Sequence, residues 1–338
     1  METLLAVENL KTYFYTRDGV VKAVDGVSFT LEAGQTLGVV GESGSGKSVT
    51  AMSIMRLIKG PQGRVVDGSI RFKGRDVLAM DDEAVRDLRG NRIAMIFQDP
   101  MTSLNPVFRV GDQIAESLRI HKGMGKTEAF ERAVELLKLV GIPKAEARAK
   151  DYPHQFSGGM RQRAMIAMAL ACDPDVLIAD EPTTALDVTI QAQILELMIE
   201  LQQRTGSAII MITHDLGVVA DMADNVLVMY AGRPVEFGTA DEVFYTPLHP
   251  YTWGLLDSLP RHDVSEKGEL VPIVGQPPSL IDVPSGCAFH PRCPYAQDIC
   301  RTQVPEYRAI EGGHGSACHF STDQSFRRGT AARAEVAV

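Results

Sequence analysis

The sequence predicts an α/β protein with a mainly parallel sheet and a loop that binds phosphate. Short apolar runs typical of buried strands, such as 176–179 and 209–213, alternate with helical segments. This alternation is the pattern of a parallel sheet covered on both faces. A glycine-rich stretch from Gly41 to Ser48 lies between the apolar run 37–40 and a predicted helix at 49–58. The order of strand, loop and helix favours a phosphate-binding loop over a simple turn.

The loop reads Gly41-Glu42-Ser43-Gly44-Ser45-Gly46-Lys47-Ser48 and matches G-x-x-x-x-G-K-[ST] at every specified position. Its glycines let successive backbone N–H groups turn inward, and the N-terminus of the following helix adds partial positive charge. Lys47 supplies a full charge near the β- and γ-phosphates, and the Ser48 hydroxyl suits Mg²⁺. These features predict a phosphate-loop NTPase fold.

The chain before the loop and the chain after the first helix differ in pattern. Short β-like runs at 4–7 and 27–31, separated by turns, predict a small antiparallel β part at the N-terminus. From about 100 to 170, helical periodicity replaces strands, as at Phe130, Ala133 and Leu137. We therefore expect a helical insert in the α/β domain.

Composition excludes several classes of protein. A length of 338 residues suits about two domains. The net charge of −9 argues against a nucleic-acid-binding surface, because such surfaces gather Lys and Arg. No apolar run approaches the roughly 18 residues that a membrane span needs, and no signal peptide is visible. A cytosolic location with reduced thiols is expected.

A helix-poor extension follows from about residue 241. Residues 272–305 carry seven of the chain's 18 prolines, which exclude long helices. Four of the five cysteines are spaced there as C-x5-C-x6-C-x17-C, at Cys287, Cys293, Cys300 and Cys318. Four thiolates in such a tail suggest a metal staple, either Zn²⁺ or a [4Fe–4S] cluster, and the spacing does not decide between them.

Other cysteine and histidine residues are expected to have ordinary roles. Cys172 lies in an apolar run and is predicted to belong to the core. His290, His314 and His319 are spare ligands near the four cysteines, and we predict them to be surface residues.

Two adjacent carboxylates, Asp180 and Glu181, end the strand 176–179. Ligands bind at this end of the strands in open α/β sheets. In phosphate-loop NTPases an Asp in this place holds Mg²⁺, and a following Glu can orient and polarise the attacking water.

Five motifs, in the same order along the chain, resemble those of ATP-binding cassette (ABC) proteins. Besides the phosphate loop, the stretch 156–162 (FSGGMRQ) looks like the family's signature motif and Gln98 like its Q-loop glutamine. Asp187 in Ala-Leu-Asp resembles the D-loop, and His214 the switch histidine. The resemblance implies catalytic roles for Lys47, Glu181 and His214.

The resemblance also implies a set of ligand contacts. The implied ATP contacts are Phe14, Gly41, Ser43, Gly44, Ser45, Gly46, Lys47, Ser48, Val49 and Gln98. The implied Mg²⁺ ligands are Ser48, Gln98 and Asp180. Phe14 is nearest to the family's position for stacking on adenine, and Tyr13 or Tyr15 is the alternative.

The signature residues Ser157, Gly158, Gly159 and Met160 begin a helix and offer a second phosphate site. In the family this site binds the ATP of a partner, so the resemblance implies a head-to-tail dimer. Met160 departs from the more usual glutamine, which puts one side-chain contact in doubt.

The extension narrows the resemblance to the D-type ATPases of dipeptide and oligopeptide importers, over residues 4 to 320. The similar segments are 98–106 (QDPMTSLNP), 249–256 (HPYTWGLL), 276–280 (QPPSL) and 286–294 (GCAFHPRCP). Some members of that subfamily carry a [4Fe–4S] cluster on these cysteines, which places the cluster ahead of zinc, with free thiols third.

The expected organisation is a nucleotide-binding domain at 1–240 with its helical part at about 100–170, an extension at 241–325 and a disordered tail at 326–338. The resemblance implies ATP-driven import with a sister ATPase, as a heterodimer, two permeases and an extracytoplasmic binding protein. The chain would then be peripheral, on the cytoplasmic face of the plasma membrane. Alternatives are another cargo (nickel, haem, glutathione or oligosaccharide) and a non-transport ABC ATPase acting on ribosomes or DNA.

Overall fold

The computed structural model describes residues 3–99, 103–183, 188–258, 272–310, 313–323 and 326. The chain forms two compact units. Unit 1 comprises residues 1–6, 30–36 and 71–212, and unit 2 comprises residues 7–29, 37–70 and 213–338. The predicted boundary near residue 240 stays a prediction, and the predicted disordered tail lies, apart from residue 326, outside the described residues.

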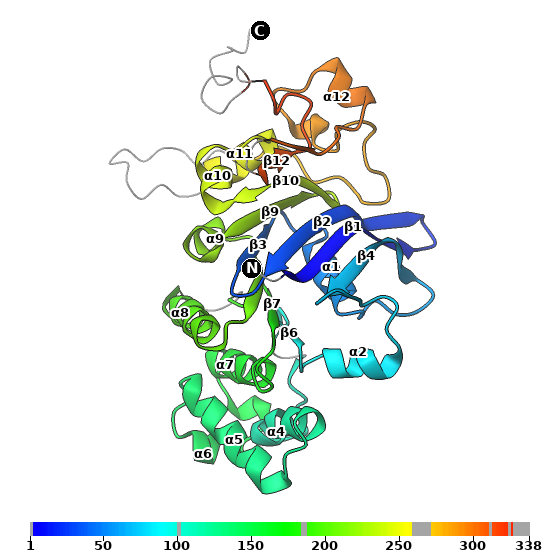
Figure 1. The fold of residues 1–338 in the computed structure, drawn as a ribbon. Coiled ribbons are helices and arrows are strands. Elements are labelled where there is room, and N and C mark those ends of the chain that lie inside the picture. Colours follow the sequence, from blue (N-terminus) through cyan, green and yellow to red (C-terminus); the bar gives the residue numbers. More distant parts are fainter. Residues whose placement is uncertain are drawn as a thin grey trace, which may run out of the picture. The chain divides into compact units, whose positions relative to one another are not determined.

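The strands and helices follow the expected alternation along the chain (Figure 1). The strands are β1 (Thr3–Tyr15), β2 (Val20–Glu32), β3 (Thr36–Val40), β4 (Gly63–Phe72), β5 (Arg75–Asp76), β6 (Ile93–Ile96), β7 (Val176–Asp180), β8 (Ala208–Ile212), β9 (Asn225–Tyr230), β10 (Arg233–Thr239), β11 (Arg308–Ala309) and β12 (Gly315–Ser316). The helices are α1 (Lys47–Ile54), α2 (Asp82–Leu88), α4 (Val110–His121), α5 (Lys126–Leu139), α6 (Ala145–Arg148), α7 (Gly158–Ala169), α8 (Val188–Thr205), α9 (Leu216–Met222), α10 (Ala240–Tyr245), α11 (Pro250–Asp257) and α12 (Asp298–Thr302).

In unit 1, the strands β8, β7 and β6 are parallel neighbours in that order. All five residues of β7 are buried, as expected for a central strand with both faces covered. The apolar stripe of α8 includes Ile194, Leu197 and Leu201, which are buried. Because the strands are parallel, the carboxyl ends of β6 and β7 lie at the same edge.

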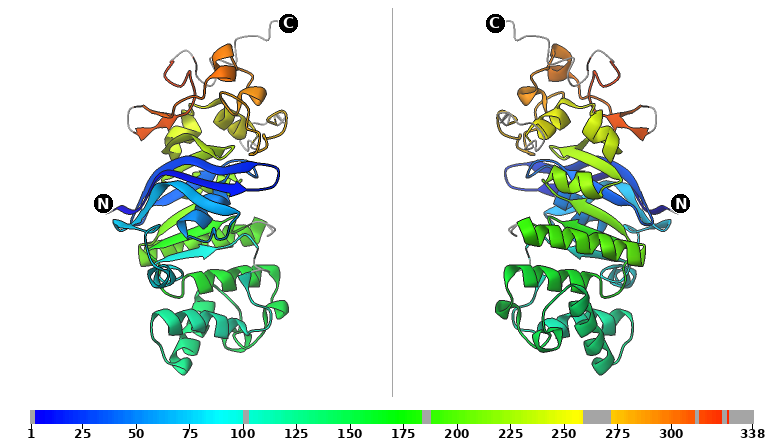
Figure 2. Two further views of the ribbon diagram at one scale, coloured as in Figure 1. Left: turned by 90° about the vertical axis from the view of Figure 1, so that its right-hand side faces the viewer. Right: turned by 90° about the vertical axis from the view of Figure 1, so that its left-hand side faces the viewer.

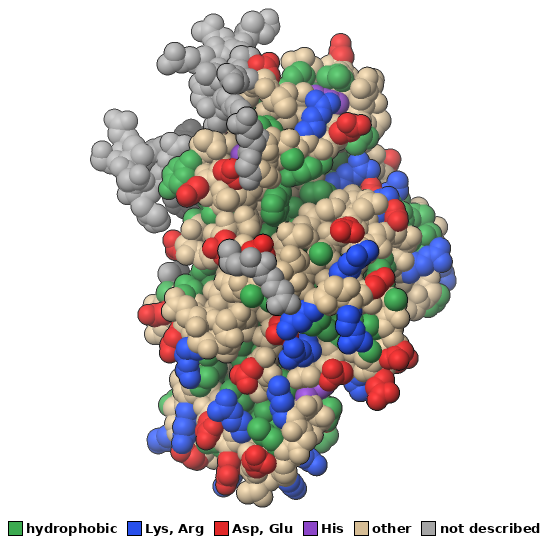
Figure 3. Space-filling view, in the orientation of Figure 1, with side chains coloured by type: hydrophobic (Ala, Val, Ile, Leu, Met, Phe, Trp, Pro, Cys, Tyr) green, Lys and Arg blue, Asp and Glu red, His purple; other side chains and the backbone are tan. Residues whose placement is uncertain are grey.

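The predicted helical insert of unit 1 is confirmed as helices α4 to α7 (Figures 1 and 2). Ala133 and Leu137 are fully buried on the inner face of α5. The helix ends where Gly141 takes a left-handed φ of +73°, a conformation that glycine adopts easily. On the face of the molecule seen in Figure 3, basic and acidic side chains are mixed over this part of the chain.

In unit 2, β3 pairs in parallel with β9, and β10 pairs antiparallel with both β9 and β12. β2, β1 and β4 are neighbours in a separate N-terminal antiparallel sheet. The extension shares a core with the strands, because the rings of Tyr230 on β9, Tyr251 on α11 and Phe289 in the extension lie 4.6 to 5.3 Å apart. All three rings are buried. The extension is therefore part of the fold of unit 2.

Helix α1 is shorter at its C-terminus than the sequence predicts. It runs over Lys47–Ile54 instead of 49–58. Arg56 takes a left-handed φ of +49°, Arg56 N donates to Ser53 O at 2.9 Å, and Leu57 N donates to Met52 O at 2.8 Å. These paired bonds satisfy carbonyls left over at a helix end, so the helix stops one turn early.

No helix among the described residues is both long and apolar enough to cross a membrane.

Candidate functional site

The phosphate loop connects β3 to α1 in unit 2, and its glycines are required by close packing. A Cβ on Gly41 would lie 2.2 Å from the carbonyl oxygen of Met229, and one on Gly46 would lie 2.2 Å from that of Ala23. Both glycines also have positive φ angles, +145° and +104°. No other residue fits these positions without moving the neighbouring backbone.

Lys47 is the first residue of α1 and is buried, with 5% of its surface exposed. Its Nζ donates to the carbonyls of Gly41 at 2.6 Å and Glu42 at 3.0 Å, so the ammonium lies inside the curve of the loop. Ser45 is also buried and its carbonyl accepts the N–H of Gly232 at 3.0 Å, which ties the loop to the end of β9. The loop is thus a fixed, positively charged cradle.

Glu42 was given no role by the sequence, yet the extension contacts it twice. Its N–H donates to the Tyr251 hydroxyl oxygen at 2.8 Å. Its carboxylate accepts from both terminal nitrogens of Arg292, at 2.6 and 3.0 Å. Glu42 precedes Arg292 by 250 residues. No local pattern in the sequence could have joined them.

The three candidate aromatic residues at the end of β1 differ in their surroundings. Tyr13 donates from its hydroxyl to Asp25 at 2.8 Å, and burial together with this bond raises its pKa to about 12. Tyr15 stacks under the guanidinium of Arg64, 4.7 Å from the ring centroid. Phe14 is half-buried, and its ring lies so close to Gly63 that a Cβ there would be 2.6 Å from it.

His214 is an exposed residue between β8 and α9 in unit 2. The preceding Thr213 is buried and donates from its N–H to Val39 O at 3.2 Å. The following Asp215 caps α9 by accepting from Gly217 N at 2.9 Å and Val218 N at 3.4 Å. The backbone bond of Thr213 and the side-chain cap of Asp215 therefore hold His214 in the turn before α9.

In unit 1, the structure brings Gln98, Asp180 and Glu181 to one edge of the sheet. Gln98 follows β6, and Asp180 is the last, buried residue of β7. Gln98 Nε2 donates to the Glu181 carboxylate at 2.9 Å. Glu181 has a left-handed φ of +46° and donates its N–H to Ile212 O at 2.8 Å. A non-glycine residue with this φ is uncommon and is often found at functional sites.

The signature residues lie at the N-terminus of α7 in unit 1. Ser157 caps the helix by accepting from Met160 N at 3.3 Å, while the buried ring of Phe156 anchors the preceding turn. Ser157 and Gly158 are exposed, and a Cβ on Gly158 would meet no atom within 4 Å. Gly159 is closer to its surroundings, with Ile190 3.2 Å from such a Cβ. The exposed backbone N–H groups at this helix start suit an anion that approaches from outside.

The predicted D-loop residue Asp187 lies outside the described residues, as do residues 100–102 after the Q-loop glutamine. The remaining predicted site residues are divided between the two units. Phe14, Gly41, Ser43, Gly44, Ser45, Gly46, Lys47, Ser48, Val49 and His214 belong to unit 2. Gln98, Ser157, Gly158, Gly159, Met160, Asp180 and Glu181 belong to unit 1.

The four cysteines of the extension lie in unit 2 as free thiols. Burial raises the pKa of Cys293 to about 12, and Cys287, Cys318 and Cys300 act in the same direction. Burial likewise raises the pKa of Cys318 to about 12, with Cys287 and Cys300 adding to the effect. The four thiols are therefore close enough to interact electrostatically.

Nearby backbone N–H groups act on the pKa values of these cysteines in the opposite direction. Those of Phe289 and His290 act to lower the pKa of Cys287, and that of Tyr295 acts to lower the pKa of Cys293. Phe320 N–H does the same for Cys318. Such donors favour a charged sulfur, whereas burial and the neighbouring thiols oppose it.

No group of three or more His, Cys, Asp or Glu side chains among the described residues is arranged to hold a metal ion. His314 corrects the prediction of a surface histidine, because it is buried and its Nε2 lies 2.9 Å from Glu236. Cys172 is fully buried, as predicted.

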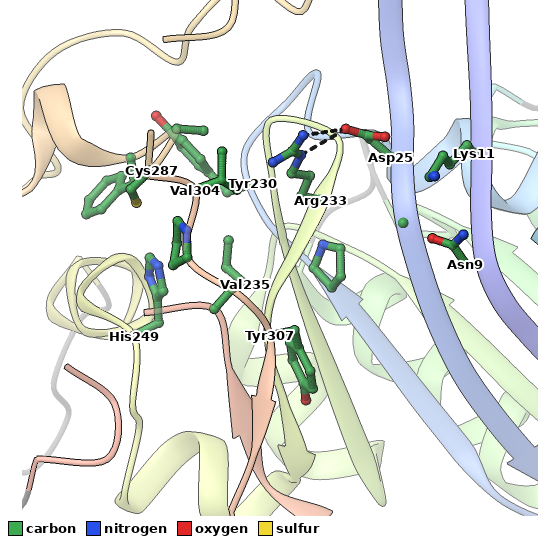
Figure 4. Close-up of a pocket in the computed structure, with 16 residues that line it drawn as sticks. Asn9, Lys11, Asp25, Tyr230, Arg233, Val235, His249, Cys287, Val304 and Tyr307 are labelled. Carbon is green, nitrogen blue, oxygen red and sulfur yellow. Dashed lines mark hydrogen bonds and ion pairs between the residues drawn. The ribbon is translucent and has the colours of Figure 1, made fainter. Parts of the chain in front are cut away.

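A pocket of about 330 Å³ in unit 2 separates the N-terminal sheet from the extension (Figure 4). Arg233 on β10 spans toward β2 and makes two hydrogen bonds to Asp25, at 2.9 and 2.6 Å. Burial disfavours the Asp25 charge, but the bonds from Tyr13 and Arg233 outweigh it and lower the pKa of Asp25. Cys287 and His249 lie on the opposite side of the pocket.

Two family models match the chain. That of ABC transporters matches residues 24–184, which include the phosphate loop, the signature motif and the carboxylate pair. That of the C-terminal region of oligopeptide and dipeptide transporters matches residues 235–300, which include Tyr251 and Arg292.

Relatives are similar over nearly the whole chain. The oligopeptide transport ATP-binding protein OppD of Salmonella typhimurium is 56% identical over 315 residues, 93% of each chain. The oligopeptide transport ATP-binding protein AppD of Bacillus subtilis is 53% identical, over 96% of this chain and 98% of its own. The dipeptide transport ATP-binding protein DppD of Lactococcus lactis is 56% identical, over 93% and 89%.

Solved structures share the fold of the cassette part. A bacterial ABC transporter cassette in dimeric form has a TM-score of 0.63 and 26% identity, over 70% of this chain and 99% of its own. The protein cbiO1 of Clostridium perfringens, part of an ABC transporter complex, has a TM-score of 0.61 and 30% identity, over 72% and 91%.

Proposed function

The chain belongs to the ATP-binding subunits of oligopeptide and dipeptide ABC transporters, and we propose that it hydrolyses ATP to drive the import of peptides. One observation carries this proposal. A cassette and the extension typical of oligopeptide and dipeptide transporters occur in one chain, and relatives named for peptide transport match both parts.

The residues of unit 2 are proposed to bind the nucleotide. The glycine-rich loop and the buried Lys47 suit the β- and γ-phosphates. The Ser48 hydroxyl, in the first turn of α1, suits Mg²⁺, which neutralises charge on the phosphates. Phe14 is proposed to stack on adenine, with Tyr13 or Tyr15 as the alternative. His214 is proposed to contact the γ-phosphate.

The residues of unit 1 are proposed to carry out hydrolysis. Asp180 and Gln98 are the other proposed Mg²⁺ ligands, at the carboxyl ends of β7 and β6. Glu181 is the proposed base or orienting group for the attacking water. The bond from Gln98 to Glu181 supports a shared role, since it couples the start of the helical insert to the proposed base.

A head-to-tail dimer is proposed to complete the ATP site. Ser157, Gly158, Gly159 and Met160 of one subunit would face the phosphate loop of a sister subunit, with Asp187 nearby. Support comes from the exposed helix start at Ser157 and from the dimeric form of the similar cassette. ABC cassettes dimerise and work with membrane permeases in importers. For this chain we propose a heterodimer, two permeases and an extracytoplasmic binding protein, with the chain on the cytoplasmic face of the membrane.

A [4Fe–4S] cluster is proposed for Cys287, Cys293, Cys300 and Cys318. Four cysteines are a common ligand set for such a cluster, and Zn²⁺ is the alternative. The mutual influence of the four thiols and the N–H donors to their sulfur atoms support this proposal. The positive charge of its iron atoms would stabilise the thiolate form of the cysteines, which burial disfavours.

Ligand-stimulated hydrolysis tests the proposed function. The chain is co-expressed with its sister ATPase, the neighbouring permeases and the binding protein, and the complex is reconstituted in liposomes. We expect peptide-loaded binding protein to raise the rate of ATP hydrolysis above that of the unloaded protein. Stimulation only by nickel, haem, glutathione or an oligosaccharide would reassign the cargo, and hydrolysis stimulated by ribosomes or DNA would favour the non-transport alternative.

A further inference from the structure

The extension holds the phosphate loop through one residue of that loop, Glu42. The backbone contact comes from Tyr251, whose hydroxyl oxygen accepts the Glu42 N–H at 2.8 Å. The side-chain contact comes from Arg292, at 2.6 and 3.0 Å. The Arg292 side chain is only 5% exposed and that of Glu42 is 27% exposed, so solvent screens this ion pair weakly.

Arg292 is itself held in place by its own segment. It donates to the carbonyls of Val274 at 3.1 Å and Ile273 at 3.3 Å. Its guanidinium lies 5.9 Å from the centroid of the Tyr230 ring, and its pKa is raised by the bond to Glu42. These contacts fix the orientation of the guanidinium that binds Glu42.

The position of Glu42 explains why its contacts with Tyr251 and Arg292 matter for phosphate binding. Glu42 lies between Gly41 and Ser43, in the stretch whose N–H groups form the cradle, and its carbonyl accepts from Lys47 at 3.0 Å. A carboxylate beside such a cradle repels phosphate unless a cation neutralises it. Arg292 supplies that cation and draws the carboxylate toward the extension.

We propose that Arg292 is a positioning residue for nucleotide binding, which neutralises Glu42 and lets the extension set the affinity of the phosphate loop. The inference rests on the proposed role of the loop as the ATP site. It differs from a purely structural role in one respect. A substitution of Arg292 weakens nucleotide binding because the charge of Glu42 is no longer neutralised. A second substitution that removes the Glu42 charge therefore restores the affinity.

The test measures the Kd of Mg-ATP for the full-length chain by calorimetry. Arg292→Gln is expected to raise the Kd about tenfold, because the uncompensated carboxylate then adds negative charge to the phosphate loop. Arg292→Gln combined with Glu42→Gln is expected to return the Kd to within about threefold of the original chain. Arg292→Lys keeps the charge and is expected to retain most of the affinity, which covers the case in which Arg292→Gln does not fold.

Two controls separate the possible failures. Arg148→Gln removes the ion pair of Arg148 with Asp151 in the helical insert of unit 1 and should leave the Kd unchanged. Lys47→Ala should abolish binding, and if it binds like the original chain, the proposed ATP site itself is wrong. If Lys47→Ala fails to bind but Arg292→Gln binds normally, or the double variant is as weak as Arg292→Gln, the inference about Arg292 is overturned.

Discussion

At the scale of single residues, Glu181 combines three features of a working carboxylate. It stands at the carboxyl end of a buried parallel strand, has a left-handed backbone and accepts a hydrogen bond from Gln98 at 2.9 Å. The sequence predicted its place from the apolar strand before it. The φ of +46° and the contact with Gln98 depend on tertiary packing, so no pattern in the sequence predicts them.

Glu181→Gln is expected to keep ATP binding and to lower turnover by about 10²- to 10⁴-fold, the usual weight of a positioned acid or base. The amide keeps the shape of the side chain but cannot take a proton. Single-turnover hydrolysis and nucleotide affinity, measured on the same preparation, separate the two effects. Hydrolysis at the original rate would remove Glu181 from the mechanism.

At the scale of elements, the start of helix α11 contains a buried histidine that should respond to pH. His249 caps the helix by accepting the Tyr251 N–H on Nδ1 at 3.0 Å. Burial lowers the pKa of His249 from 6.5 to about 3, so the folded chain keeps it neutral. Below about pH 6.5 the unfolded chain binds a proton that the folded chain does not, and stability therefore falls as the pH falls.

His249→Asn should remove this pH dependence, because asparagine can cap the helix but does not titrate. Between about pH 7.5 and 5.5, the original chain is expected to lose about 1.4 kcal/mol more unfolding free energy than the variant. Urea unfolding at both pH values measures the difference. Equal losses for the two proteins would show that His249 is not kept neutral in the folded chain.

The four-cysteine segment gives a second test at this scale. If the proposed cluster is present, chain purified without oxygen should be brown, absorb broadly near about 400 nm and contain iron and sulfide in equal amounts. Cys293→Ser should lose the colour, while Cys172→Ser, at a core cysteine outside the extension, should keep it. A colourless chain with one zinc per molecule would reject the cluster.

Elements were predictable from the sequence where the pattern was local. The parallel strands and the helical insert follow from hydrophobic periodicity. The early end of α1 was not predictable, since Arg56 adopts a conformation usually taken by glycine. The burial of His314 was also missed, because its partner Glu236 is 78 residues away.

At the scale of the whole molecule, the extension and the strands around the phosphate loop form one unit. The aromatic rings of Tyr230, Tyr251 and Phe289 pack together in a shared core. The ion pair of Glu42 with Arg292 adds an electrostatic contact between the two parts. Sequence motifs identified both parts but treated them as separate modules. Contacts across more than 200 residues are invisible to a motif, because spacing along the chain does not report distance in space.

The central claim is that ATP bound at the phosphate loop of this chain drives peptide import. The most direct measurement is uptake of a labelled peptide by proteoliposomes that contain the reconstituted importer, with either the original chain or Lys47→Ala. We expect the substitution to abolish uptake while the complex still assembles and binds peptide-loaded binding protein. Uptake at the original rate with Lys47→Ala would contradict the claim and assign the driving step to the sister subunit alone.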